Sequence, residues 1–456
     1  MKNRRLIQSD PTRQSSVAIR SRVVRKRLRW ALCFVTLAFA WSRPAIAESE
    51  SSDLTLSTEQ ITFGPKHHFF GYIGHVQNIP WNASGRYIVA LQTDFHDHMP
   101  KPDEAADVVL IDTEQGNKVL SVDQSRAWNF QQGTMFYWNP KNPETQFFFN
   151  DRDPETGRVF CVLFDISKGQ HGRRVREYRF EDTPVGNGGV AQNGGTFLGI
   201  NYGRMDRLRP VTGYPGAFDW TVGVAHPRDD GIFKIDIATG EKTLLVSFHQ
   251  LARTIRPIHP HVDQTPLFIN HTLWNREDDR IYFYARGNFS KSGKERINVP
   301  FTVKPDGSGL TPLKTFIGGH PEWDYGHRVI GVLGDRQILY DVDRQLVVGT
   351  LGSSDIFPKP GADISLSPDG KWFVNGHMDR EVGKNFYNIY CRSNGTHLRT
   401  AGFSTGQYQR GELRIDPAPR WNRTSDAILV PCWTDEGTRQ MFIIRIQPAS
   451  KREPAD

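Results

Sequence analysis

The sequence predicts an all-β protein, a seven-bladed β-propeller built from four-stranded antiparallel blades. Its apolar runs are short, rich in β-branched and aromatic residues, and bounded by Gly, Asn, Asp and Pro, as is typical of strands. A turn between two such runs recurs seven times along the chain. Most copies are followed by a hairpin signal with Asp-Gly, Asn-Gly or Thr-Gly at the bend. One turn unit and one hairpin together supply the four strands of a blade.

The repeat is clearest in residues 269–284, INHTLWNREDDRIYFY, where a Trp-Asn turn separates two apolar runs. The other six copies begin at Pro80, Tyr137, Val190, Glu322, Leu366 and Arg420. Seven units within residues 48–456 average about 58 residues, which is longer than the roughly 40–50 residues of known blades. We assign the excess to loops, the longest from Asn201 to Asp229, and expect one short helix, at Phe248–Thr254.

The two ends of the repeat region each lack a partner strand. The last unit stops after Gln440–Ile446 without a fourth strand, and the run Leu54–Phe63 precedes the first unit. Pairing these runs would complete the last blade, and a closed ring leaves only short, protected strand edges. The sequence therefore predicts one propeller domain over residues 48–456, closed by an N-terminal strand. Six or eight blades are the alternatives to seven, because the third unit is irregular.

Residues 1–47 have the pattern of a secretory signal peptide. They contain eleven Lys and Arg against the single acid Asp10, then the apolar run Trp30–Trp41, and they end in Ala45-Ile46-Ala47. The apolar run is shorter than the ~20 residues of a membrane-spanning helix. We therefore expect an exported protein, periplasmic or secreted, with no membrane span once the leader is removed.

The net charge changes sign when this leader is set aside. The whole chain has 57 Lys and Arg, 50 Asp and Glu, and a net charge of +7, whereas residues 48–456 keep 46 and 49, a net charge of about −3. This balance argues against nucleic-acid binding. Three cysteines remain, Cys161, Cys391 and Cys432. We expect them to be small buried residues, with one disulfide as the alternative in an exported protein.

The innermost strand of each propeller blade lines the central channel, so equivalent positions form a ring. Counting four residues back from each turn gives Asn78, Met135, Asn187, His271, His320, Asp363 and Ala418. His271, His320 and Asp363 come from three consecutive units, so we expect them in one sector of the channel. Two histidines and a carboxylate suit a divalent ion such as Mn or Fe, or a general base held by a carboxylate. The alternative is an ordinary polar lining of a water-filled channel.

Four polar side chains crowd the long loop YGRMDRLRPVTGY: Arg204, Arg207, Arg209 and Tyr214. Arginines on a loop above a channel can bind a substrate carboxylate in a bidentate manner. A solvated or salt-bridged loop is the alternative interpretation.

Two further segments have two interpretations each. Residues 128–132, which end in Gln132, form either a platform for a sugar or part of the core. The HPHVD segment, with His259 and His261, is either a second group of metal ligands or a proline-containing surface loop.

Two sets of motifs resemble known propeller families. LSPDGKW, residues 366–372, resembles the turn of TolB-like propellers. NHTLWN and GHPEWD, which place His271 and His320 four residues before the turn, resemble the oligogalacturonate lyases of polysaccharide lyase family 22. This resemblance implies a seven-bladed propeller that cleaves uronate oligosaccharides by β-elimination, with a histidine base, an essential arginine and a Mn-type ion held mainly by histidines. It implies His271 as the base and His320 as a metal ligand.

The chain departs from this pattern in two places. Before the SPDG turn, where the lyases have a His-rich stretch, this chain offers only Asp363 as a ligand. In the last unit, where relatives can show His-Pro-Arg-Trp, it has Ala418-Pro419-Arg420-Trp421. Both departures bear on the metal site, and through it on the activity.

Together these features predict an exported lyase that cleaves acidic oligosaccharides or polysaccharides by metal-assisted β-elimination. His271 is the expected base, and Arg204 or Arg209 is expected to neutralise the uronate carboxylate as the enolate forms. His320 and Asp363 would hold the ion together with His271, or orient the base. The expected substrate contacts are Arg207, Tyr214, Gln132 and Asn78.

Two other functions stay open at this point. One is a non-catalytic propeller that binds carbohydrate or protein. The other is a glycoside hydrolase, which would need two carboxylates roughly 5–10 Å apart. Asp363 is the one carboxylate in the ring, and Glu322 would have to point inward to supply the second.

Overall fold

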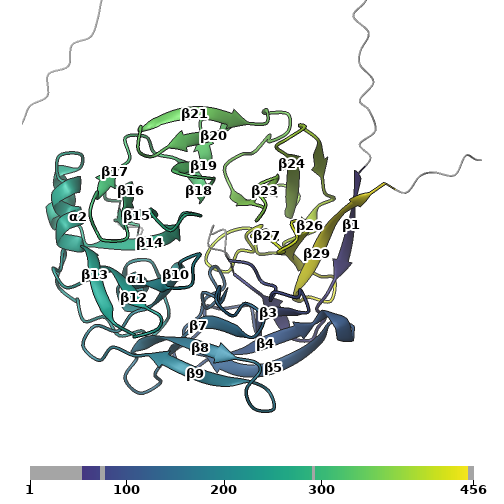
Figure 1. Ribbon diagram of the computed structural model, residues 1–456, viewed down its shortest axis with the longest axis horizontal. Coiled ribbons are helices and arrows are strands. Elements are labelled where there is room, and N and C mark those ends of the chain that lie inside the picture. The colour runs from purple at the N-terminus through teal and green to yellow at the C-terminus, as the bar shows by residue number, and fades with distance from the viewer. Residues whose placement is uncertain (1–53, 72–77, 290–292, 450–456) are drawn as a thin grey trace, which may run out of the picture. The chain divides into compact units, whose positions relative to one another are not determined.

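The computed structural model describes residues 54–71, 78–289 and 293–449, and the predicted signal peptide lies outside these ranges. The described chain is a β-propeller of four-stranded antiparallel blades arranged around a centre (Figure 1). Strands β10, β14, β18 and β27 lie near that centre, and β5, β9, β13 and β21 lie at the rim. No helix among the described residues is long and apolar enough to cross a membrane.

Five sheets have four strands each. The first contains β2 (His67–Phe69), β3 (Tyr87–Thr93), β4 (Ala106–Asp112) and β5 (Lys118–Ser125). The second contains β6 (Tyr137–Trp138), β7 (Gln146–Arg152), β8 (Val159–Asp165) and β9 (Arg173–Tyr178). The third contains β10 (Gly186–Val190), β11 (Thr196–Ile200), β12 (Gly231–Asp236) and β13 (Lys242–Ser247). The fourth contains β14 (Leu267–Trp274), β15 (Ile281–Gly287), β16 (Ile297–Val303) and β17 (Thr311–Pro312).

The fifth of these sheets joins the two ends of the propeller. It contains β27 (Arg420–Trp421), β28 (Ala427–Trp433), β29 (Arg439–Pro448) and β1 (Leu54–Gln60). β1 pairs antiparallel with β29, from Leu54 opposite Pro448 to Gln60 opposite Phe442. The predicted closure by an N-terminal strand is therefore confirmed.

The sixth sheet has nine strands and consists of two antiparallel runs. One run is β18 (Gly318–Trp323), β19 (Arg328–Leu333), β20 (Arg336–Asp341) and β21 (Leu346–Leu351). The other is β22 (Asp363–Leu366), β23 (Trp372–Asp379), β24 (Lys384–Cys391) and β25 (His397–Arg399), with β26 (Phe403–Ser404) also paired to β24. A single parallel bridge, between His320 and Asp363, connects β18 to β22.

The tryptophan of the repeated turn has a structural role between neighbouring blades. The indole N–H of Trp138 donates to the carbonyl of Pro80 at 2.7 Å. Trp323 donates in the same way to Leu273 at 2.9 Å, and Trp421 to Ser365 at 3.0 Å. All three rings are buried, so each one fills the space between blades while its one polar atom is satisfied. This explains why the turn recurs with an aromatic residue.

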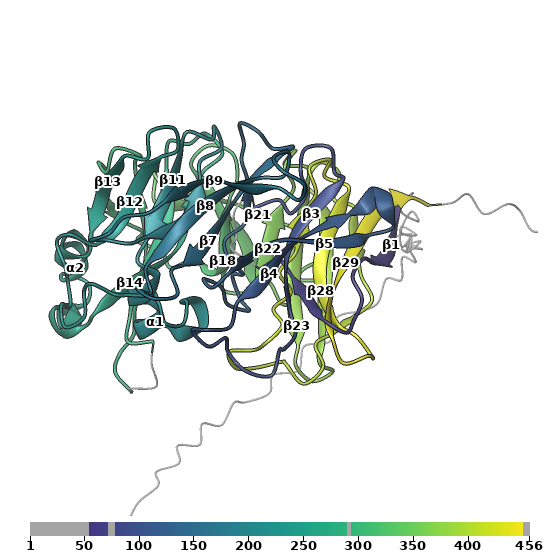
Figure 2. The same cartoon turned by 90° about the horizontal axis from the view of Figure 1, so that it is seen from below.

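Two short α-helices interrupt the strand pattern, and their ends are capped. α2 (Phe248–Ile255) has a capping box formed by Ser247 and Gln250, and it lies at the rim beside β13 (Figure 1). α1 (Tyr202–Leu208) begins at Asn201, whose side chain accepts from the N–H of Arg204. α1 lies at one face of the ring (Figure 2). Single 3-10 turns cover Thr113–Gln115, Pro210–Thr212 and Pro260–Gln264.

The expectation for α2 is confirmed, and the expectation of an unstructured loop at 201–229 is wrong in its first part. The seven residues of α1 are too few for a clear apolar pattern in the sequence, and the cap and the packing of Tyr202 and Met205 into the core stabilise the helix. All three cysteines of the described chain are buried and unpaired, as expected for small buried residues.

Candidate functional site

Three of the predicted ring positions have a strained backbone. Met135, His271 and Ala418 have positive φ angles of 59°, 59° and 43°, a region that L-residues avoid. In β14 the pairing with β15 shifts between Asn270 and Leu273, so His271 falls inside a bulge. A bulge turns a side chain away from the regular alternation. Backbone strain of this kind concentrates at functional sites, which makes the His271 position a candidate.

His271, His320 and Asp363 lie next to one another, as their register predicts. The imidazole centroids of His271 and His320 are 5.2 Å apart. Nδ1 of His320 is hydrogen-bonded to Oδ1 of Asp363. The backbone N–H of Ala418 donates to Oδ2 of Asp363 at 2.9 Å. Asp363 is 2% exposed, so its carboxylate has a fixed orientation and holds the His320 ring in place.

Asp363 and His271, the two neighbours of His320, differ in their charge near neutral pH. Burial alone would raise the pKa of Asp363, but the charge and hydrogen bond of His320 lower it overall, so the carboxylate is ionised. Burial lowers the pKa of His271 well below its ordinary value, and the charges of His320, Arg286 and Arg209 act in the same direction. His271 is therefore neutral near pH 7 and able to accept a proton.

These histidines open into a pocket with about 420 Å³ of atom-free space. It is lined by Gln131, Gln132, Arg209, Thr212, Asn270, His271, Arg286, His320, Arg414 and Asp416. The lining contains three arginines and one carboxylate, Asp416. A pocket with this excess of positive charge favours an anionic ligand, and its guanidinium groups match the geometry of a carboxylate.

The pocket arginines are held by hydrogen bonds and aromatic faces. Arg286 donates from Nη1 to Asn270 Oδ1 at 2.7 Å and from Nε to Asn298 Oδ1 at 2.8 Å. Burial lowers its pKa to about 10, so it stays charged near neutral pH. Arg414 Nε donates to Asp416 Oδ1 at 2.8 Å. Arg209 lies over the ring of Phe289, 5.5 Å from its centroid.

Asp416 is the acidic side chain of the pocket. Burial and the nearby charge of Asp363 raise the pKa of its carboxyl, although Arg414 and His320 oppose this. Arg286, Arg414 and Asp416 were not among the residues predicted from the sequence. The signal for Arg286 is an arginine inside an apolar strand, β15, that pairs with the histidine-bearing β14. Arg414 and Asp416 lie before β27, outside any repeat motif.

Three loop residues predicted to contact substrate do not line this pocket. Arg204 is 0% exposed. Its guanidinium donates to four protein oxygens, those of Leu267, Thr221, Val224 and Ala225. Arg207 forms an ion pair with Asp219 at 2.8 Å. Tyr214 is fully buried and stacks on Tyr202, with centroids 4.1 Å apart. These side chains stabilise the loop and are not placed to meet a ligand in the pocket.

The remaining predicted contacts are divided between the pocket and the core. Gln132 lines the pocket. Asn78 is 3% exposed and donates from Nδ2 to the carbonyl of Phe136 at 2.6 Å, so it belongs to the packing between blades. Glu322, the second carboxylate that a hydrolase would need, is 0% exposed. It does not line the pocket, so it is not the second carboxylate that the sequence offered for a hydrolase.

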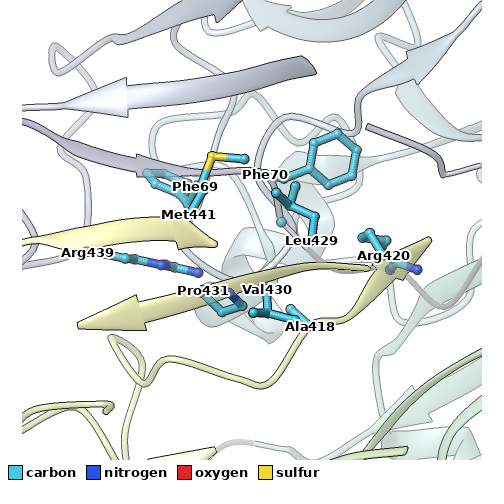
Figure 3. A pocket seen from close by; sticks show the side chains of 10 residues that line it. Phe69, Phe70, Ala418, Arg420, Leu429, Val430, Pro431, Arg439 and Met441 are labelled. Carbon is cyan, nitrogen blue, oxygen red and sulfur yellow. The ribbon is translucent and has the colours of Figure 1, made fainter. Parts of the chain in front are cut away.

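A second cavity lies between β2 and the last blade, with about 270 Å³ of atom-free space. Figure 3 shows its mainly apolar lining, with Phe69, Met441 and Leu429, and with Arg420 and Arg439 on opposite sides. Its lining contains no histidine and no carboxylate. The cavity offers no proton-transfer residue.

The predicted metal ligands do not form a three-ligand centre among the described residues. One oxygen of Asp363 is engaged by His320 and the other by the N–H of Ala418. A buried carboxylate in this state orients an imidazole and has no oxygen directed at a shared ion. His271 and His320 remain as two potential nitrogen ligands, and a Mn-type ion at these two histidines stays a prediction.

Comparison with known proteins supports the fold. No protein-family model matches the chain, and no curated protein matches it. Among solved structures it is similar to an oligogalacturonate lyase from Vibrio parahaemolyticus, with 13% identity, a TM-score of 0.53, and coverage of 86% of this chain and 97% of that chain. A likeness at this identity shows a β-propeller and no more.

Two other solved structures are similar at lower scores. The β-propeller domain of the Trilobed protease from Pyrococcus furiosus has 11% identity and a TM-score of 0.45, covering 81% of this chain and 96% of that chain. TolB from Acinetobacter baumannii has 14% identity and a TM-score of 0.37, covering 80% and 83%.

Proposed function

We propose that this protein is an exported lyase that cleaves uronate-containing oligosaccharides or polysaccharides by β-elimination in the pocket between His271 and Asp416. We count the two runs of the nine-stranded sheet as two blades, which gives a seven-bladed ring. The likeness to an oligogalacturonate lyase is consistent with this proposal, which does not depend on it.

The observation that carries the proposal is the combination of side chains in one pocket. Two imidazoles, one of them oriented by an ionised carboxylate, share the pocket with three arginines. β-Elimination next to a carboxylate needs a base for a weakly acidic proton and a positive charge to stabilise the enolate. The pocket contains both.

In the proposed reaction, Arg209, Arg286 and Arg414 bind the uronate carboxylate. An imidazole nitrogen of neutral His271 removes the proton on the carbon next to that carboxylate, and the negative charge spreads onto the carboxylate oxygens beside the guanidinium groups. The electron pair then forms a carbon–carbon double bond as the neighbouring carbon–oxygen bond breaks. His320, oriented by Asp363, is placed to donate a proton to the leaving oxygen. Water exchange returns both imidazoles to their initial states.

A Mn-type ion is a separate proposal, and no step above uses it. If it binds, His271 and His320 are the side chains that would hold it, and the ion would add positive charge beside the substrate carboxylate. Elemental analysis of purified protein, before and after treatment with a chelator, tests this proposal directly. Loss of one ion together with loss of activity would support it.

The test of the proposed function is turnover of defined substrates by the chain from residue 48 onward. Acidic uronate oligosaccharides should give the ultraviolet absorbance of an unsaturated product, and neutral oligosaccharides should not. A hydrolytic product without this absorbance would contradict the lyase mechanism. Binding of uronate oligosaccharides without any product would identify the alternative, a non-catalytic binding propeller.

Export is proposed from the leader sequence. A reporter fused after residue 47 should reach the periplasm or the medium, and a reporter fused to a leader with its apolar run interrupted by charges should stay in the cytoplasm. Retention of the first fusion in the cytoplasm would contradict the proposal.

A further inference from the structure

A group of three potential metal ligands lies outside the pocket described above. It consists of His259 and His261, at the start of the 3-10 turn Pro260–Gln264, and of Glu295, in the connection between β15 and β16. One ligand atom of each lies within 4.8 Å of the others, and this is the only such group of His, Cys, Asp and Glu within residues 54–71, 78–289 and 293–449. His259 Nδ1 is 3.6 Å and His261 Nδ1 is 3.7 Å from the Glu295 carboxylate.

The backbone around the two histidines is held in place. The N–H of His259 donates to the carbonyl of Ile255 at 2.9 Å, which continues α2 into the turn. Thr265 Oγ1 donates to the carbonyl of His261 at 3.1 Å. The histidine spacing is therefore fixed before any ligand binds, as a metal site requires for high affinity.

The Glu295 segment is tied to the same turn. Asn288 donates from Nδ2 to the carbonyl of Glu295 at 2.9 Å and to Thr265 Oγ1 at 3.2 Å. The Glu295 side chain itself is 71% exposed, so it is free to adjust. His261 Nε2 is buried and has no hydrogen-bond partner among the described residues. The other ring nitrogen of His261, Nδ1, is the one that lies near Glu295.

We propose that His259, His261 and Glu295 bind one divalent ion of the first transition row, with Zn²⁺ the best fit. Two imidazoles and a carboxylate are a ligand set that Zn²⁺ accepts, with water in the fourth position. Neighbouring ligand atoms in a tetrahedral zinc site are about 3.4 Å apart. The 3.6 Å and 3.7 Å separations between the histidine nitrogens and the carboxylate oxygens are close to this value, and all three ligand atoms lie within 4.8 Å of one another.

The ion would connect α2 and its following turn to the β15–β16 connection. That connection also bears Phe289, whose ring is contacted by Arg286 and Arg209 of the pocket, with centroid distances of 5.4 Å and 5.5 Å. The proposed ion therefore holds the segment against which two carboxylate-binding arginines rest. This site does not depend on the proposed lyase activity, because its ligands are outside the pocket.

The test uses untagged, chelator-treated protein titrated with Zn²⁺ by calorimetry. The wild-type chain should bind one more Zn²⁺ than His259→Ala or His261→Ala, and Glu295→Ala should weaken that binding about tenfold or more. Zn²⁺ should raise the Tm of the wild type but not of His261→Ala. His249→Ala, a variant of a half-exposed histidine on α2, is the matched control and should behave as the wild type.

The visible absorption spectrum of bound Co²⁺ distinguishes an ion at this site from an ion at His271 and His320. Co²⁺ in a four-coordinate site absorbs visible light strongly, and this absorbance should persist in His320→Ala and disappear in His261→Ala. Equal Zn²⁺ stoichiometry and equal Tm shifts in the wild type, His259→Ala and His261→Ala would overturn the proposal. Circular dichroism of the metal-free variants checks that each is folded.

Discussion

His320 and Asp363 are joined twice, once through their side chains and once through their backbones. Nδ1 of His320 is hydrogen-bonded to the Asp363 carboxylate, and the same two residues form the only parallel bridge between β18 and β22. The geometry of this pair is therefore set by the pairing of two neighbouring inner strands. Such a pair can orient an imidazole without relying on flexible side chains.

Asp363→Asn should abolish most of the activity while the fold is kept. The amide has the same shape, but it lacks the charge that orients and stabilises His320 during proton transfer. We expect kcat to fall at least about 100-fold, with KM changed little, when unsaturated product is followed by absorbance. Asp379→Asn, which alters an ion pair with Lys359 and does not change the pocket lining, is the control. Full activity of Asp363→Asn would contradict the role of this pair.

Substitutions of His271 should separate the effect of its backbone conformation on stability from the effect of its imidazole on activity. Asn tolerates the left-handed conformation, whereas a β-branched residue does not, and the φ of His271 is 59°. His271→Asn and His271→Val should both be inactive, but the Val variant should be less stable to urea by about 1 kcal/mol. Residual activity in both variants would show that another group is the base.

Arg286→Gln should weaken binding of acidic substrates. It removes a buried guanidinium held by Asn270 and Asn298 in the pocket, and charge-assisted bonds to a carboxylate are worth about 1.5–3 kcal/mol. KM for uronate oligosaccharides should therefore rise about tenfold or more. Arg399→Gln, an exposed arginine of β25, should leave KM unchanged. An unchanged KM in Arg286→Gln would remove this residue from the binding site.

Arg204→Gln should affect stability and not substrate binding. The substitution leaves four acceptors without their donor, two of them buried, and losses of this kind cost about 3 kcal/mol. Urea denaturation should show this loss, while KM should stay within about twofold. A stable variant with a raised KM would return Arg204 to the substrate contacts predicted from the sequence.

His327 should make stability depend on pH. Burial alone would lower its pKa, but hydrogen bonds to Asp279 and Asp343 raise it above 6.5. The stabilisation is therefore complete below about pH 6.5 and is lost as pH rises through the folded-state pKa. Wild type should exceed His327→Gln in stability at pH 6, by less than about 1 kcal/mol because the pair is half-exposed, and the difference should shrink by pH 8.5. His397→Gln, an exposed histidine, should show no such change. A difference that is constant between these pH values would contradict the assignment.

The fold could be predicted because the repeat has a local physical cause. Three Trp residues of the turn, Trp138, Trp323 and Trp421, are buried and donate to a carbonyl of the preceding blade, as Trp323 does to Leu273. The need to fill the space between neighbouring blades recurs along the chain, so the turn sequence repeats at a regular spacing. α1 left no comparable signal, because a seven-residue helix held by the Asn201 cap needs no apolar period.

The site could be predicted only where it follows the repeat. His271, His320 and Asp363 occupy equivalent positions in successive blades, so their proximity follows from register. Arg286 and Arg414 reach the pocket from a second strand and from a connecting loop, whose paths no repeat determines. Arg204 and Arg209 look alike in the loop sequence. Only tertiary packing gives Arg204 four internal acceptors and leaves Arg209 in the pocket lining.

The single parallel bridge between His320 and Asp363 has a mechanical consequence. Because these residues supply both the backbone contact between β18 and β22 and the oriented imidazole, the two strands cannot separate without taking the histidine from its carboxylate. Loosening of this bridge would inactivate the pocket while the two antiparallel runs that it joins remained intact. Activity would therefore depend on this one contact between β18 and β22, and it would be lost in denaturant before the strand signal in circular dichroism.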